Sequence, residues 1–174
     1  MKRRKFIDAL EAGGVVSIAE GGKWLPLSRE HPHLTIDAAI QSLDDLNLDT
    51  ATSNGAWSIA RTFDHLRQGI EFSIAGYPEE KSRLFQNTIG RVAFSVFRAR
   101  GAMSHALDQV IPGEQLAIQT REPETARADL IHALELFRDS NVMLKPHFAF
   151  GKLDKADYAI AHALHIDNHM VEFN

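Results

Sequence analysis

Cysteine is absent from this 174-residue chain. Its absence excludes disulfide frameworks, thiolate zinc sites and a cysteine nucleophile, so any metal ion must be held by His, Asp, Glu or water. The sequence also lacks any apolar run that approaches the roughly 20 residues of a membrane span. Positive charge is not in excess either, and the formal net charge of −4 argues against nucleic acid or an anionic membrane as the main partner.

Hydrophobic residues make up 44% of the sequence, which is enough for one sizeable core in a chain of about one domain. No internal repeat or low-complexity segment divides the chain. Histidine is abundant, with nine residues. Because chance alone would give roughly 0.4–0.5 histidine pairs at a spacing of four residues, such a spacing carries weight only in a helical context.

Residues 1–34 are predicted to form an N-terminal extension to a main domain of residues 35–174. The first seven residues resemble a twin-arginine export signal, but three acidic residues interrupt the apolar region that should follow: Asp8, Glu11 and Glu20. A structured alternative is a short helix that ends at Gly13-Gly14, followed by a hairpin of residues 15–20 and 23–27. We therefore expect a cytoplasmic protein, with export as the alternative.

Apolar residues recur at helical spacing throughout the main domain and predict four or five helices. The expected helices start near Thr35 or Asp37, run from about Ala56 to Ala75 and from about Leu84 to Leu107, and start again at Pro123 and after Asp154. Ser53 or Asn54 could cap the second helix, and Asp154 could cap the last one. No segment has the pattern of a core strand, so the sequence predicts an all-α bundle.

The last predicted helix carries a polar stripe on an otherwise apolar surface. At roughly 100° per residue, five of its side chains fall within an arc of about 80°: Tyr158, His162, His165, His169 and Glu172. Buried polar groups need partners, and imidazoles four residues apart on a helix can share one metal ion. This helix is therefore predicted to contribute metal ligands.

Periodicity does not identify a third ligand. His65 lies roughly 140° from the centre of the apolar stripe on its helix, so the pattern alone predicts a half-exposed polar residue. His105 and His132 have no partner at helical spacing, which indicates structural or solvent-exposed positions.

Two long motifs resemble those of the DinB-like, or YfiT-type, superfamily of metal-binding four-helix bundles, and more narrowly a bacterial branch of it. One motif runs from Trp57 through His65 to Gly76-Tyr77-Pro78. The other comprises Pro146-His147-Phe148, Phe150-Gly151-Lys152-Leu153 and His165-Ile166-Asp167-Asn168-His169. The resemblance covers about Thr35 to Phe173 and implies an up-down-down-up four-helix bundle.

Carried over to this chain, the superfamily's metal triad falls on His65, His165 and His169. Asn168 stands where the branch usually has a second adjacent histidine, a position outside the triad. All-nitrogen ligation suits zinc or nickel, with cobalt or ferrous iron as alternatives. Three protein ligands leave coordination positions open for water or substrate, as in catalytic sites.

Three further residues are candidates for the predicted site. His162 shares the ligand stripe and could be a catalytic proton shuttle, or it could be a hydrogen-bonded core histidine. Glu172, one turn beyond His169, could orient a ligand or act as a base, or it could belong to a frayed terminus. His147 lies in a loop, where it could bind substrate or could be an ordinary surface residue.

The resemblance implies two chemistries, namely a hydrolase and a transferase that uses a low-molecular-weight thiol, and the sequence does not separate them. Either enzyme would act on a small-molecule substrate, and the superfamily often forms homodimers. The competing hypothesis is a non-catalytic bundle in which the metal ion has a structural or sensing role. A fourth protein ligand, such as His162, would favour that hypothesis.

Overall fold

A computed structural model describes residues 31–115 and 121–174, and these residues form an all-α bundle without strands. The all-α prediction is therefore confirmed. Five helices of nine residues or more and two short ones form it: α2 (Ile36–Asp44), α3 (Ile59–Ala75), α4 (Arg83–Phe85), the π-helical turn η1 (Gln86–Gly90), α5 (Arg91–Arg100), α6 (Pro123–Asp139) and α7 (Lys155–Met170).

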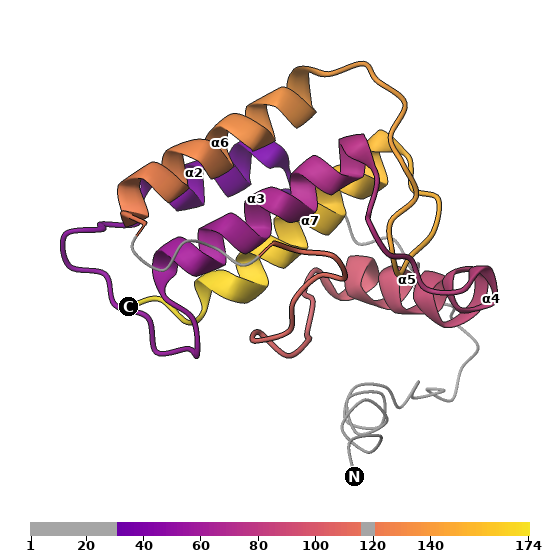
Figure 1. Ribbon diagram of the computed structural model, residues 1–174, viewed down its shortest axis with the longest axis horizontal. Coiled ribbons are helices and arrows are strands. Elements are labelled where there is room, and N and C mark those ends of the chain that lie inside the picture. The colour runs from indigo at the N-terminus through magenta and orange to yellow at the C-terminus, as the bar shows by residue number, and fades with distance from the viewer. Residues whose placement is uncertain (1–30, 116–120) are drawn as a thin grey trace, which may run out of the picture.

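Four helices make up the bundle. Helix α3 packs against α6 and α7, and α2 packs against the same two helices, so the four close around a shared core. In Figure 1, α3 and α6 run in one direction while α2 and α7 run in the other, which is an up-down-down-up order. The α4–η1–α5 segment lies outside this ring, where α5 contacts α7.

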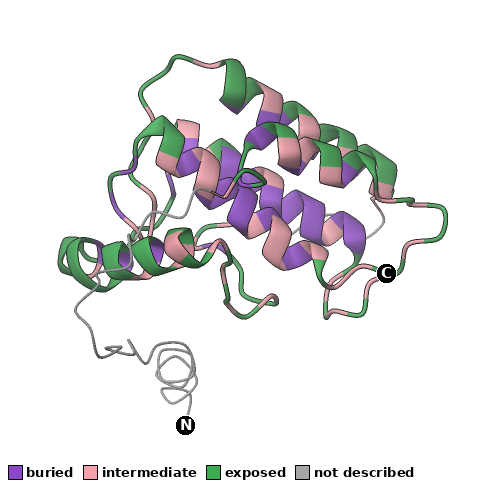
Figure 2. Ribbon diagram, turned by 180° about the vertical axis from the view of Figure 1, so that it is seen from behind, coloured by how far each residue is buried: buried purple, intermediate pink, exposed green. Residues whose placement is uncertain are grey.

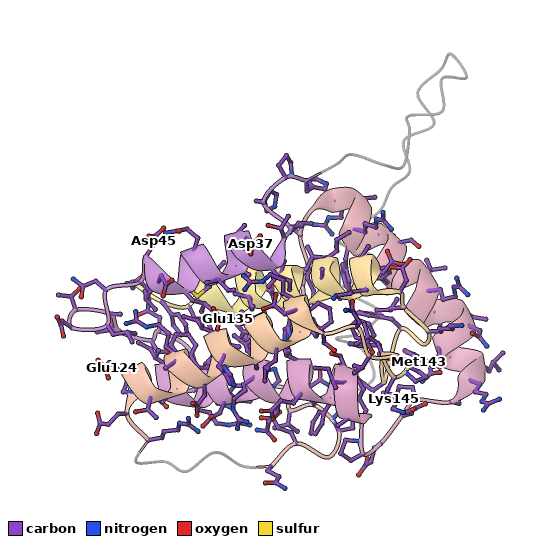
Figure 3. All side chains as sticks on the ribbon, turned by 90° about the horizontal axis from the view of Figure 1, so that it is seen from above. Asp37, Asp45, Glu124, Glu135, Met143 and Lys145 are labelled. Atoms are coloured by element: carbon purple, nitrogen blue, oxygen red, sulfur yellow. The ribbon has the colours of Figure 1, made fainter. Side chains whose placement is uncertain are left out.

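Buried residues gather where the helices face one another, most densely on α3 and α7 (Figure 2). The fully buried apolar residues include Leu43, Phe63, Leu130 and Leu164, one from each helix of the ring. Charged residues at the outer surface, such as Asp37, Asp45 and Glu124, are exposed (Figure 3). The core therefore forms because each helix places an apolar face inward.

Hydroxyl and carboxylate side chains cap three of the four bundle helices at their N-termini. Thr35 accepts a hydrogen bond from the Ala38 N–H. Asp154 accepts one from the Asp157 N–H and caps the last helix, as its position predicted. Helix α3 instead begins three residues later than expected and is capped by Ser58. The proposed cap Ser53 donates to the carbonyl oxygen of Trp57 at 2.6 Å, so this predicted cap is wrong.

The predicted helix from Leu84 to Leu107 is partly wrong. Helical structure is continuous from Arg83 to Arg100 and then stops. Gly101 takes a left-handed conformation, with φ 67°, and the Ala102 N–H donates to the carbonyl oxygen of Phe97. This is a Schellman motif, which ends the helix at a glycine, so residues 101–107 lie in a loop.

The predicted helix and hairpin of the N-terminal extension fall within residues 1–30, outside the described residues. His31, the first described residue, packs against the bundle: its ring lies over Gly101, and its Nε2 is 3.3 Å from the carbonyl oxygen of Ala99. Among the described helices, none combines the length and apolar character that crossing a membrane requires.

Candidate metal centre

Three histidines from two helices converge inside the bundle. His65 of α3 and His165 and His169 of α7 each offer a ring nitrogen, and these nitrogens all lie within 4.8 Å of one another. The Nε2 atoms of His65 and His165 are 3.1 Å apart. His65 and His169 are fully buried and His165 is half-buried. These three side chains, called the triad below, could hold a metal ion.

The two elements place the triad through simple geometry. His165 and His169 are one turn apart on α7 and therefore share a face. Helix α3 packs against α7 and brings His65 opposite them. The resulting ring centroids lie 4.9–5.1 Å from one another.

His65 is buried because a loop covers the side of α3 that periodicity left exposed. Gln68 of α3 pairs with the backbone of Gln115 through two hydrogen bonds, of 2.8 and 3.0 Å. The side chain of Ile111 packs on Gly69, where a Cβ would come within 3.1 Å of it. The half-exposed position that periodicity alone indicated for His65 is therefore wrong, since that pattern reflects contacts between helices and not the cover of a loop.

Both ring nitrogens of His169 are buried without any hydrogen-bond partner in the described residues. Leaving buried polar atoms unpaired is costly, so native structures seldom do it. Burial, followed by the charges of His65 and His105, lowers the pKa of His169 to about 3. Its ring is therefore neutral and keeps a lone pair, which is the form that binds metals.

Glu114 holds His65 from the side opposite the other two histidines and was not identified from the sequence. Its Oε2 lies 2.7 Å from Nδ1 of His65 and accepts a 2.9 Å hydrogen bond from the Ile111 N–H, while Oε1 pairs with Arg61. Burial opposes ionisation of Glu114, but its hydrogen bonds with His65 and Arg61 outweigh the effect of burial, so the pKa of Glu114 lies below the ordinary value. Glu114 lies in a helix-free segment 49 residues from His65, and no spacing rule connects them.

A carboxylate on Nδ1 fixes the tautomer of His65. The carboxylate keeps a proton on Nδ1, and Nε2 then presents its lone pair toward His165. Metal-binding histidines commonly have this carboxylate partner on the second nitrogen. The arrangement around His65 therefore fits a ligand for a divalent ion.

Two half-buried rings flank the triad. Trp57 stacks on His169, with centroids 6.2 Å apart and planes at 11°, and it meets His65 edge-on at 5.0 Å. The Arg61 guanidinium lies 4.3 Å above the Trp57 ring. His105 lies 5.1 Å from the His165 ring and 5.4 Å from the His169 ring. The sequence pattern gave His105 no role at the site, because it placed His105 in a helix where the residue had no partner at helical spacing.

His162 lies outside the triad, within the aromatic core. Its Nε2 is 3.3 Å from the Ser73 hydroxyl oxygen, its ring stacks on Tyr158 at 5.4 Å, and it meets Phe137 edge-on at 4.9 Å. Burial lowers the pKa of His162 to about 3. This environment matches the alternative of a hydrogen-bonded core histidine.

His147 organises the loop before α7. Its Nδ1 accepts hydrogen bonds from the N–H groups of Ala149 and Phe150, both at 3.1 Å, and its ring stacks on Phe150 at 4.3 Å. Burial and then the charge of His162 lower the pKa of His147 to about 3. These contacts give His147 a structural role in the loop.

Glu172 closes the C-terminal end of the bundle through its backbone. Its N–H donates to the carbonyl oxygen of His169 at 3.1 Å, and its own carbonyl accepts from the Asn54 N–H at 2.9 Å. Its carboxylate lies against Gly55, where a Cβ would come within 2.4 Å of it. The segment around Gly55 and the C-terminal residues are therefore held together close to the triad's last histidine.

Comparison with known proteins gives one match. A family model described as "Protein of unknown function (DUF1569)" matches residues 28–174, which include the whole bundle and all three histidines. No curated protein and no solved structure matches the chain.

Proposed function

Since the chain belongs to the family described as "Protein of unknown function (DUF1569)", a description that carries no activity over to it, we propose from its geometry that it is a metal-dependent enzyme. Its divalent ion is held by His65, His165 and His169. The DinB-like resemblance of the two sequence motifs supports the same three ligands.

One observation carries this proposal: three imidazoles converge, and one of them, His169, has two ring nitrogens without a protein partner in the described residues. Packing alone does not account for this arrangement, because buried leucines would fill the space without the cost of desolvating three imidazoles. A shared ion would give His169 the partner that it lacks.

The donor set suggests which ion binds. Three neutral nitrogen ligands and the absence of cysteine favour zinc or nickel over the hard cations calcium and magnesium. When bound, such an ion supplies Lewis-acid activation of water or of a thiol.

The chain's own residues prepare the site for that ion. Glu114 holds a proton on Nδ1 of His65 and turns Nε2 toward the other two histidines. Arg61 pairs with Glu114 and packs on Trp57, which covers one side of the triad. Together these contacts orient the ligands and limit the access of water to the site.

The substrate class that we propose is a small molecule, processed either by hydrolysis or by transfer to a low-molecular-weight thiol. Arg61, the guanidinium that lies over Trp57 beside the triad, is paired with Glu114 and is therefore not free to bind an anionic substrate. Both the hydrolase and the thiol transferase are therefore kept for the test, and the homodimer stays a prediction.

The test is a screen of metal-replete protein against ester, amide and thiol-conjugation substrates. The wild-type protein should be active on one of these classes, and His169→Ala should lose the activity. His132→Ala changes an exposed histidine on α6 and should retain it. Absence of activity, or equal activity in the wild type and in His169→Ala, would leave the ion with a structural or sensing role and would remove the enzyme from the proposal.

A further inference from the structure

A fourth imidazole, that of His105, lies beside the proposed metal centre, although its nitrogens are outside the group of donor atoms within 4.8 Å of one another. The centroid of the His105 ring is 5.1 Å from that of His165 and 5.4 Å from that of His169. The triad's own rings are 4.9–5.1 Å apart. His105 therefore faces two of the three proposed ligands at nearly the distance that those ligands keep from one another.

The tautomer of His105 suits a metal ligand. Its Nδ1 is 3.0 Å from the carbonyl oxygen of Ala106, so Nδ1 carries the hydrogen and donates it, while Nε2 keeps its lone pair. Within residues 31–115 and 121–174, no hydrogen bond to Nε2 is formed.

The backbone around His105 is free of helix and strand. Before it, the loop is fixed at the Schellman turn and by Met103, which packs against a small cluster of Leu34, Ala163 and Leu164. After it, Gln115 is held by Gln68. Between these two anchors, the backbone of residues 104–109 is held by the turn bond from the Gln109 N–H to the carbonyl oxygen of Ala106. His105 can therefore move toward or away from the triad without unwinding a helix.

We propose that His105 is an exchangeable fourth ligand, which binds the ion through Nε2 when no other donor is present and gives up its position to an incoming donor. The inference rests on the metal site of the proposed function and adds to it a residue that controls access to the ion. In chemical terms, one metal–nitrogen bond breaks as the bond to the incoming donor forms, and no electron or proton transfer is required. This exchange explains how a metal ion covered by side chains could still accept a substrate.

The probe is cobalt(II), whose visible absorption depends on the number and kind of its ligands. We expect the wild type to show the spectrum of four nitrogen ligands, and His105→Ala to show a different spectrum and a cobalt affinity about tenfold weaker. Added imidazole should restore the wild-type spectrum in His105→Ala, because it replaces the missing side chain. His105→Gln serves as a second variant that preserves more of the side-chain packing, and His132→Ala serves as the control.

A competition experiment gives a second readout. In the wild type, imidazole must displace His105 from the ion. The apparent Kd of imidazole for the wild type should therefore be about tenfold higher than for His105→Ala, because only sites with an open coordination position can bind imidazole. Equal spectra and equal imidazole affinities in the wild type and both variants would overturn this inference and leave the three-histidine site intact. Failure of the wild type itself to bind cobalt would instead refute the metal site of the proposed function.

Discussion

The carboxylate of Glu114 determines how His65 presents itself to the other two histidines. It contacts Nδ1 of His65 at 2.7 Å and is itself held by the Ile111 N–H and by Arg61. A histidine without such a partner could expose either nitrogen and could rotate, which would lower its affinity for an ion. At the scale of single residues, the site therefore depends on a side chain that binds no metal.

Glu114→Gln should lower the affinity for zinc by about 10–100-fold. The neutral amide accepts a weaker hydrogen bond from His65 and leaves Arg61 without its counter-ion. Affinity can be measured by competition with a chromogenic chelator. Glu71→Gln is the matched control, since Glu71 is exposed and pairs with Arg67, and an equal loss of affinity in both variants would contradict the role of Glu114.

Two other histidines make stability depend on pH. Burial holds the pKa of both His147 and His162 at about 3, whereas an unfolded chain protonates histidine near pH 6.5. Below about pH 6.5 the unfolded state therefore binds more protons than the folded state. The contribution of these histidines to the free energy of unfolding is constant above about pH 6.5 and decreases as the pH falls toward about 3. The loss between about pH 7 and pH 5 should approach roughly 2 kcal/mol for each histidine.

Urea unfolding at these two pH values, with chelator present, checks this expectation. His147→Asn keeps an acceptor for the N–H groups of Ala149 and Phe150 and removes the titrating group, so it should flatten the pH dependence by about one histidine's share. The exposed variant His132→Ala should leave the slope unchanged. A wild-type free energy of unfolding that is independent of pH over this range would contradict the neutral buried rings.

At the scale of helices, the sequence predicted most elements because capping residues and apolar spacing act locally. Thr35, Pro123 and Asp154 mark the starts of α2, α6 and α7 within one residue. The end of α5 was missed because apolar residues continue past Gly101, while the left-handed glycine ends the helix. The start of α3 was missed because Ser53 is engaged by the Trp57 carbonyl, a contact that no propensity describes.

Gly90 of η1 packs directly against the backbone of the loop that precedes α7. A Cβ at Gly90 would come within 1.9 Å of the Ala149 carbonyl oxygen and 3.3 Å of the Phe150 Cα, and backbone atoms cannot move aside as flexible side chains can. Gly90→Ala should therefore destabilise the protein by at least about 1–3 kcal/mol, the usual cost of overpacking.

Chemical unfolding of Gly90→Ala measures this cost. Ser95→Ala, on an exposed position of the same helical segment, should stay within about 0.5 kcal/mol of the wild type. If Gly90→Ala were as stable as Ser95→Ala, the loop before α7 would not pack directly on η1.

At the scale of the whole molecule, the sequence predicted which site residues of a single helix lie together. It did not predict which residues from different segments join them. His165 and His169 share a face of α7 through their spacing alone. The position of His65 came from family motifs, since its burial depends on the loop at Ile111 and Gln115. Glu114 and His105 were missed for the same reason, because tertiary packing and not local periodicity brings this loop to the triad.

The metal content of purified protein after dialysis tests the proposed centre most directly. The wild type and His132→Ala should each retain a stoichiometric amount of zinc or nickel, and His165→Ala should retain none, because two histidines cannot hold the ion that the triad holds. Circular dichroism should show that all three proteins keep their helices. An unchanged metal content in folded His165→Ala would contradict the assignment of the triad.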